Sequence, residues 1–229
     1  MGIEVKQKAK LKPLKAWSFS RLNTYEQCPF KFKLTAIEGI REPGSPAMER
    51  GSLIHKEGEQ YIKGILDELP ESYKLLANAM NEVKEQGAEA ELEMTFRKDW
   101  GVTGWFDADA WVRIKIDILL VSDDTIRIID IKTGKNRGGY EDQLDLYALA
   151  ALNLYPEIKN VSAELWFTDT GEIIATSKGM YTAAMLPDLK KKWEKRVVPM
   201  FEDTIYPARP NKFCGFCHFR KANNGPCEY

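Results

Sequence analysis

The chain has 229 residues, of which 44% are hydrophobic and 29% are charged, and its formal net charge is -1 at pH 7. This composition excludes a largely disordered chain, and the length allows one large domain, alone or with a small lobe. No apolar run approaches the roughly 20 residues of a membrane helix, and the N-terminus lacks an apolar segment of the secretory kind. We therefore expect a cytoplasmic protein without membrane contact.

Charge is unevenly distributed along the chain although the total is close to zero. Lysines crowd the start, Glu and Asp concentrate between about 57 and 110, and "LKKKWEKR" at 189–196 is a basic block. Further basic residues surround the late cysteines, namely Arg209, Lys212, Arg220 and Lys221. Lysine runs are usually solvated faces, so these blocks indicate a phosphate-binding surface only if other features agree.

The first part of the chain predicts helices. The segment 18–34 indicates a short helix that Ser18 or Ser20 begins and that is interrupted near Pro29. After a loop, apolar residues at helical spacing predict an amphipathic helix over about 48–66 and a second helix over about 71–86.

The rest of the chain alternates strands with helices. From about 90 to 132 the hydrophobic period is two, and "SDD" at 122–124 separates a strand at 111–121 from a strand at 125–132. These two strands are expected to be antiparallel neighbours. A helix over 140–155, strands over 161–168 and 172–177, and a helix over about 181–202 complete an α/β or α+β domain, with helices flanking a central mixed sheet.

An acidic pair and a lysine are the first candidates for chemistry. Asp130 and Lys132 share one face of the strand at 125–132, and Asp117 on the neighbouring strand can reach the same pocket. Converging carboxylates repel each other unless a cation sits between them or one is protonated, and oxygen ligands favour Mg²⁺ or Mn²⁺. Such an ion polarises a phosphoryl group and activates water, which Lys132 can orient or deprotonate. Taken alone, Asp130 and Lys132 would be interpreted as an ordinary surface ion pair.

Two further features agree with a site in this region. His55 follows Gly51 by one helical turn, where glycine would allow close approach of another backbone. Gln143 and Tyr147 are four residues apart and therefore share one face of the helix at 140–155. Each feature alone is typical of ordinary structure.

Together, "GxxxH" (Gly51 to His55), Asp117, "DIK" (Asp130 to Lys132) and "QxxxY" (Gln143 to Tyr147) resemble the PD-(D/E)XK nuclease superfamily, specifically its RecB-like branch with AddB-type and CRISPR-associated RecB-like nucleases. The resemblance spans about 18–229 and implies a restriction-endonuclease-like core. It implies that His55, Asp117, Asp130 and the main-chain carbonyl of Ile131 bind the divalent metal. It further implies that Lys132 serves the attacking water and that Gln143 and Tyr147 help to position DNA and the active site.

The four cysteines predict a second metal site. Cys28 stands early, whereas Cys214, Cys217 and Cys227 stand at the end. In a reducing compartment disulfides are not expected, and a CxxC pair followed by another Cys is a metal-ligand pattern. Four thiolates bind either zinc or an iron-sulfur cluster, and unrelated buried thiols are the alternative. The resemblance favours a 4Fe-4S cluster, although the stretch from Cys217 to Cys227 is longer than usual in that family, so zinc stays open.

These observations predict four regions and one leading function. The regions are a basic arm (1–17), a segment that contributes Cys28 to a metal lobe (18–47), a nuclease core (48–205) and a Cys-rich metal lobe (206–229). We expect a metal-dependent nuclease, an exonuclease on single-stranded DNA or DNA ends, serving recombination, repair or phage DNA metabolism. No GxxxxGK[ST] phosphate loop is present, so unwinding would need a helicase or recombination partner. The alternative is a non-cutting DNA-binding scaffold or partner subunit.

Overall fold

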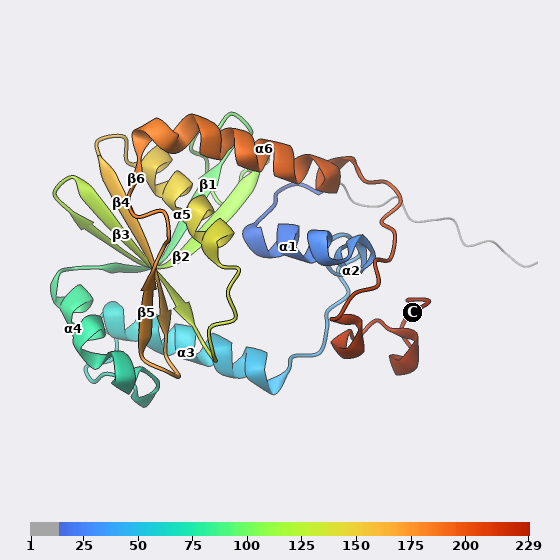
Figure 1. Ribbon diagram of the computed structural model, residues 1–229, viewed down its shortest axis with the longest axis horizontal. Coiled ribbons are helices and arrows are strands. Elements are labelled where there is room, and N and C mark those ends of the chain that lie inside the picture. The colour runs from blue at the N-terminus through green and yellow to red at the C-terminus, as the bar shows by residue number, and fades with distance from the viewer. Residues whose placement is uncertain (1–13) are drawn as a thin grey trace, which may run out of the picture. The chain divides into compact units, whose positions relative to one another are not determined.

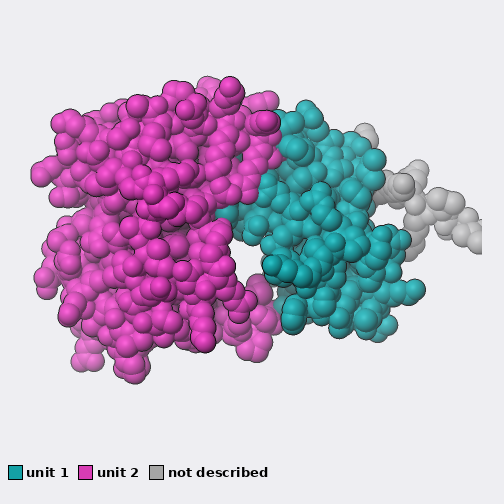
Figure 2. Space-filling view, in the orientation of Figure 1, with its two compact units in different colours: residues 1–43, 198–229 teal, residues 44–197 magenta. Residues whose placement is uncertain are grey.

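The computed structural model describes residues 14–229, so most of the predicted basic arm lies outside the described residues. The chain divides into two compact units, coloured separately in Figure 2. The larger unit is one continuous stretch, residues 44–197. The smaller unit combines the described part of residues 1–43 with residues 198–229. The two ends of the chain therefore fold together.

The larger unit contains a six-stranded sheet in the order β1-β2-β3-β4-β5, with β6 beside β4. Strands β3 and β4 are parallel and the other neighbours are antiparallel, so the predicted mixed sheet and the antiparallel pairing of β2 with β3 are confirmed. The strands are β1 (Glu89–Phe96), β2 (Val112–Ser122), β3 (Thr125–Lys132), β4 (Asn160–Phe167), β5 (Glu172–Ala175) and β6 (Tyr181–Thr182).

Helices cover both faces of this sheet, as predicted. Figure 1 shows α3 and α4 on one face, and α5 with the first turns of α6 on the other. Helix α5 forms the crossover that a parallel pair of strands requires, here between β3 and β4. The helices are α3 (Pro46–Ile62), η2 (Glu71–Leu76), α4 (Ala77–Glu85), α5 (Glu141–Leu154), η3 (Ala183–Met185) and α6 (Leu186–Glu202).

A buried apolar cluster fixes α3 against the sheet. Ile54, Tyr61 and Ile62 of α3 pack with residues of η2, α4 and the strands, including Tyr73, Met80, Ile118, Ile129 and Trp166. Gly58 is required here, because a Cβ at that position would lie 2.2 Å from the hydroxyl oxygen of Tyr73. That hydroxyl donates to the carbonyl of Ile54 at 2.9 Å. The residue after Ile54 is His55, so this packing sets the position of the histidine.

The smaller unit contains α1 (Phe19–Gln27), α2 (Pro29–Phe32), η1 (Lys33–Ile37), η4 (Cys214–Phe216) and η5 (Lys221–Asn223). Ser18 caps α1 by accepting a hydrogen bond from the amide of Arg21, and Pro29 begins a new helix, so the predicted cap and interruption are confirmed. The hydroxyl of Tyr25 donates to the carbonyl of Pro199 and to Asp203, each at 2.9 Å. These bonds connect α1 to the chain near its other end.

Some predicted element boundaries are wrong. The helix expected over 181–202 begins at Leu186, because Tyr181 and Thr182 pair with β4 as strand β6. The helix expected over 71–86 starts with a 3-10 segment, and the one expected over 48–66 begins at Pro46 and ends at Ile62. Within residues 14–229, every helix is too short or too polar to span a membrane.

Candidate active site

The site lies where two neighbouring strands separate. The ladder between β2 and β3 runs from the pair Ser122 and Thr125 to the pair Ile118 and Ile129. The next residues on the two strands are Asp117 and Asp130, and they are the first that the ladder leaves unpaired. Asp117 bridges the gap, because its Oδ2 accepts a hydrogen bond of 2.8 Å from the amide of Ile131. We call this place, where β2 and β3 separate at Asp117 and Asp130, the fork. It brings together the two carboxylates that the sequence analysis identified as candidates.

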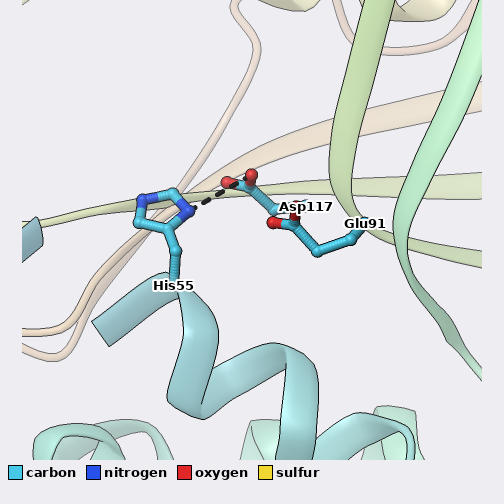
Figure 3. A group of neighbouring side chains, drawn as sticks. All are labelled: His55, Glu91 and Asp117. Carbon is cyan, nitrogen blue, oxygen red and sulfur yellow. Dashed lines mark ion pairs between the residues drawn. The ribbon is translucent and has the colours of Figure 1, made fainter. Parts of the chain in front are cut away.

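The other oxygen of Asp117 faces helix α3. Nδ1 of His55 lies 3.3 Å from Oδ1 of Asp117. Glu91 of β1 joins them, and one ligand atom from each of the three residues lies within 4.8 Å of the other two. Figure 3 shows the imidazole of His55 extending from α3 toward the carboxylates of Glu91 on β1 and Asp117 on β2. In the described part of the chain, no such group of three includes Asp130.

On the opposite side of the fork, Lys132 connects Asp130 to helix α5. Its ammonium group forms an ion pair with Oδ2 of Asp130 and donates to Oε1 of Gln143 at 2.9 Å. The amide nitrogen of Gln143 in turn donates to the hydroxyl of Tyr147 at 2.7 Å. Gln143 and Tyr147 thus lie on one face of α5, as their spacing predicted, and that face holds the lysine.

Burial and charge shift the pKa values of the site. Burial, followed by the charge of Asp117, raises the pKa of Asp130 to about 6, although Lys132 and His55 oppose the rise. Burial opposes protonation of His55, but its hydrogen bond to Asp117 and the charge of that carboxylate outweigh this and raise the imidazole pKa. Burial and the two aspartates raise the pKa of Tyr147 well above its ordinary value. The phenol of Tyr147 therefore stays protonated at neutral pH.

These residues are suitable ligands for a divalent cation. The side chain of Asp130 is 3% exposed, and its Oδ2 atom forms an ion pair with the ammonium of Lys132. Asp117 adds a second carboxylate nearby, so this one ammonium group balances only part of the negative charge, and buried charge is costly unless it is balanced. An imidazole and several carboxylates form a donor set that Mg²⁺ or Mn²⁺ accepts.

The expectation for Gly51 is wrong in its detail. A Cβ at Gly51 would first meet the side-chain oxygen of Thr133 at 3.5 Å, which is an ordinary contact and involves no backbone atom. The nearby link between α3 and the end of β3 is polar instead. Arg50 donates to both oxygens of Asp169, and the same carboxylate accepts from the amide of Gly134 at 2.8 Å.

The four cysteines all line one pocket of the smaller unit. The segment after Pro207 brings them together: Arg209 donates to the carbonyl of Glu26, and Asn211 donates to the carbonyl of Gln27 at 3.0 Å. Two backbone amides also point at sulfur. The amide of Arg209 lies 3.4 Å from Sγ of Cys28, and the amide of Asn211 lies 3.2 Å from Sγ of Cys214. None of the four forms a disulfide.

The sulfur atoms are nonetheless spread around that pocket. No three of them come within 4.8 Å of one another in the described chain. The predicted Cys-rich metal lobe is therefore not shown, and a metal held by these cysteines remains a proposal.

The sequence profile of the PD-(D/E)XK nuclease superfamily matches residues 16–222. This match covers most of the chain, and the chain belongs to that superfamily. No protein of curated function shows significant sequence similarity to it.

One solved structure agrees with this assignment at the level of the fold. A presumed exonuclease from Eubacterium rectale superposes with a TM-score of 0.50 at 16% sequence identity, covering 92% of this chain and 87% of that one. The protein SSO0001 superposes with a TM-score of 0.47 at 16% identity, with the same coverage of the two chains. At this identity the first likeness shows a shared fold.

Two features of the sequence needed the structure for their interpretation. Glu91 belongs to no motif and was missed, although Glu89, Glu91 and Glu93 alternate on β1 and so indicate an acidic strand face. Part of the basic block at 189–196 is used inside the protein, since Lys192 and Arg196 pair with acidic residues of α5. Those two side chains are therefore poor candidates for phosphate contacts.

Proposed function

We propose that this protein is a metal-dependent DNA nuclease of the RecB-like branch, acting as an exonuclease on single-stranded DNA or DNA ends. The observation that carries the proposal is the fork between β2 and β3, where Asp117 and Asp130 meet His55 on one side and Lys132 on the other. A structural ion pair would need neither the second carboxylate nor the imidazole. The presumed exonuclease with a similar fold makes exonuclease action the first activity to test.

Each residue of the fork has a proposed role in phosphodiester hydrolysis. His55, Asp117, Asp130 and the carbonyl of Ile131 would hold Mg²⁺ or Mn²⁺. The cation, when bound, supplies Lewis-acid stabilisation of the charge that develops on the phosphate. Lys132 orients the attacking water and faces the same developing charge.

Gln143 and Tyr147 determine where that lysine points. The Gln143 side chain accepts one of the three ammonium hydrogens of Lys132, and Tyr147 holds the amide of Gln143 from the other side. An ammonium group on a flexible stem otherwise samples many positions. The two residues of α5 therefore act as positioning residues, and DNA in the site would meet the same helix face.

The four cysteines are proposed to hold a 4Fe-4S cluster. Zinc with bonds of about 2.3 Å would place tetrahedral sulfurs about 3.8 Å apart. A cluster of four irons holds its thiolates farther apart, in better agreement with sulfurs that share a pocket yet stay separated. Amide groups aimed at Cys28 and Cys214 also resemble the hydrogen bonds that the sulfurs of iron-sulfur clusters accept.

The smaller unit also presents a surface for unpaired bases. Phe216 is 91% exposed and Phe213 is 49% exposed, and the ammonium of Lys212 lies 5.2 Å from the ring centre of Phe213. Exposed aromatic rings beside basic groups bind single strands by stacking. By contrast, the aromatic side chains of Trp17 and Tyr25 are buried in the core.

Incubation of the purified protein with Mn²⁺ and labelled DNA tests the activity. We expect linear single-stranded DNA to be shortened from an end while circular single-stranded DNA stays intact. Asp130→Asn should remove cleavage and retain DNA binding, because it deletes one ligand charge and leaves the surface unchanged. Asp67→Asn, a matched change at an exposed position, should cleave like the wild type.

A wild-type protein that binds DNA and leaves every form uncut with Mg²⁺ or Mn²⁺ would overturn the proposal in favour of a DNA-binding scaffold. Cutting of circular DNA would support nuclease activity but contradict the proposal that the protein is an exonuclease. If protein purified without oxygen contains zinc and neither iron nor labile sulfide, the proposal of a 4Fe-4S cluster is wrong. The proposed nuclease activity is not affected by that result.

A further inference from the structure

Glu91 has an unusual conformation for a residue inside a strand. Its φ is 59°, in the left-handed region that residues other than glycine rarely adopt. The ladder between β1 and β2 pairs Ala90 with Ile118 and Leu92 with Ile116, so Glu91 is directly opposite Asp117, and this one pair is missing. Such outliers gather at functional sites, because the surrounding fold must hold them in place.

The left-handed turn brings the carboxylate of Glu91 to the candidate active site. Its ligand atom lies within 4.8 Å of those of His55 and Asp117, and Figure 3 shows it beside Asp117. Two residues of this group, His55 and Glu91, line an open polar pocket together with Glu59 and Lys115. Glu91 is therefore both near the expected cation and on the solvent path to it.

An ion pair with Lys115 does not by itself explain this conformation. The ammonium of Lys115 pairs with Glu91, yet the residue directly opposite Lys115 in the ladder is Glu93. Glu93 is exposed and has no left-handed backbone, so it could pair with the lysine at no conformational cost. The side chain of Glu91, by contrast, is only 14% exposed. The left-handed backbone of Glu91 is thus explained by the position of its carboxylate and not by the ion pair with Lys115.

We propose that Glu91 is an additional ligand of the divalent cation, which adds a third carboxylate to those of Asp117 and Asp130, and that its left-handed backbone keeps it in position. The inference rests on the proposed nuclease function and extends it to a residue outside the superfamily motif. A carboxylate that is already held in place loses little freedom when it binds a cation, so its presence should increase affinity for hard divalent ions.

The test is Mn²⁺ binding by the complete protein, measured by isothermal titration without DNA. Glu91→Gln should weaken Mn²⁺ binding about tenfold, since it removes a negative oxygen donor at nearly constant shape. Glu93→Gln, which makes the same change on the same face of β1, should bind Mn²⁺ like the wild type. Lys115→Gln should bind Mn²⁺ as tightly as the wild type or more tightly, because it removes a positive charge beside the cation.

The outcomes separate this inference from the nuclease proposal. Equal Mn²⁺ affinity of the wild type and Glu91→Gln, or an equal loss in Glu91→Gln and Lys115→Gln, overturns the role of Glu91 as a ligand. If Asp117→Asn also leaves the Mn²⁺ affinity unchanged, the proposed metal site is wrong. The proposed nuclease function, which depends on that site, is then wrong as well. The thermal midpoint of each variant in metal-free buffer shows whether it folds, and Glu91→Asn, which tolerates the left-handed backbone, replaces Glu91→Gln if that variant does not.

Discussion

Among single residues, Asp117 connects the two sides of the candidate site. One oxygen accepts the amide of Ile131 at the end of β3, and the other faces His55 on α3. Because both oxygens of Asp117 have partners, the carboxylate cannot rotate without losing its contact with Ile131 or with His55. The position of Asp117 is therefore set before any cation arrives, which reduces the reorganisation that binding would cost.

Asp130 gives the site a dependence on pH. Burial, followed by the charge of Asp117, raises its folded-state pKa to about 6, whereas an unfolded aspartate has a pKa of about 3.9. Between these values the folded protein holds a proton that the unfolded chain has released. The stability of the metal-free protein should thus fall as pH rises through this window.

Cation binding should show the opposite trend. A ligand must lose its proton, and the pKa values of Asp130 and His55 are both raised, so Mn²⁺ affinity should fall about tenfold or more per pH unit below about pH 6. Titrations at pH 5.0, 6.0 and 7.5 measure this, and urea denaturation without divalent cations measures the stability trend. Mn²⁺ affinity that is constant between pH 5.0 and 7.5 would contradict the assignment of Asp130 as a ligand.

The sequence was sufficient for the motif residues but insufficient for Glu91. Alternation along β3 places Asp130 beside Lys132, and a four-residue spacing places Gln143 beside Tyr147, so local geometry predicts both pairs. The position of Glu91 depends on the register between β1 and β2 and on one left-handed residue. Neither follows from local spacing, because register is decided by packing across the sheet.

At the scale of elements, α5 contacts the candidate active site on one face and a buried charge network on another. One face holds Gln143 and Tyr147 toward the site, and another face holds Asp142 and Asp145 against basic residues. Asp145 accepts bonds from Lys178, Lys192 and the hydroxyl of Tyr181. The helix that positions Lys132 is thus fixed by a network of charges on its far side.

Asp145→Asn should be strongly destabilising for this reason. The side chain of Asp145 is 1% exposed, and neutralising it leaves two ammonium groups beside a neutral amide. We expect a loss of roughly 3 kcal/mol in the free energy of unfolding. Asp142→Asn, one turn earlier and 40% exposed, should cost about 1 kcal/mol or less.

Urea denaturation of the two variants measures the difference. Equal losses would mean that burial does not decide the value of these charges. Because α5 carries Gln143, we also expect Asp145→Asn to cleave DNA more slowly once the folded fraction is taken into account.

Long-range pairing explains the error in the last predicted helix. The segment from 181 contains apolar residues that continue the pattern of α6, so a single helix was a reasonable prediction. Tyr181 and Thr182 instead pair with Val161 and Asn160 at the edge of β4. Aromatic and β-branched residues fit a strand well when a partner is available, and the sequence does not show that partner.

For the whole molecule, the cysteines show how the ends of the chain are joined. Their positions near both ends predicted a shared lobe, and in the structure all four line one pocket of a unit built from both ends. The limits of that unit were not evident from the sequence, because residues 198–202 continue helix α6, and Pro199 inside it does not end the helix. A continuous helix conceals a boundary that only packing reveals.

If the cysteines hold a metal centre, its removal should loosen the smaller unit alone. The ligands connect Cys28 to three residues nearly the whole chain away, so their loss frees a long loop and releases Arg209 and its basic neighbours. In Cys227→Ser, hydrogen exchange should therefore rise in residues 14–43 and 198–229 and stay unchanged in the sheet of residues 44–197. Affinity for single-stranded DNA should fall, while Mn²⁺ affinity is retained. Glu228→Gln, a change at the neighbouring residue that spares the sulfurs, should match the wild type, and faster exchange throughout the sheet of Cys227→Ser would show that the centre supports the entire fold instead.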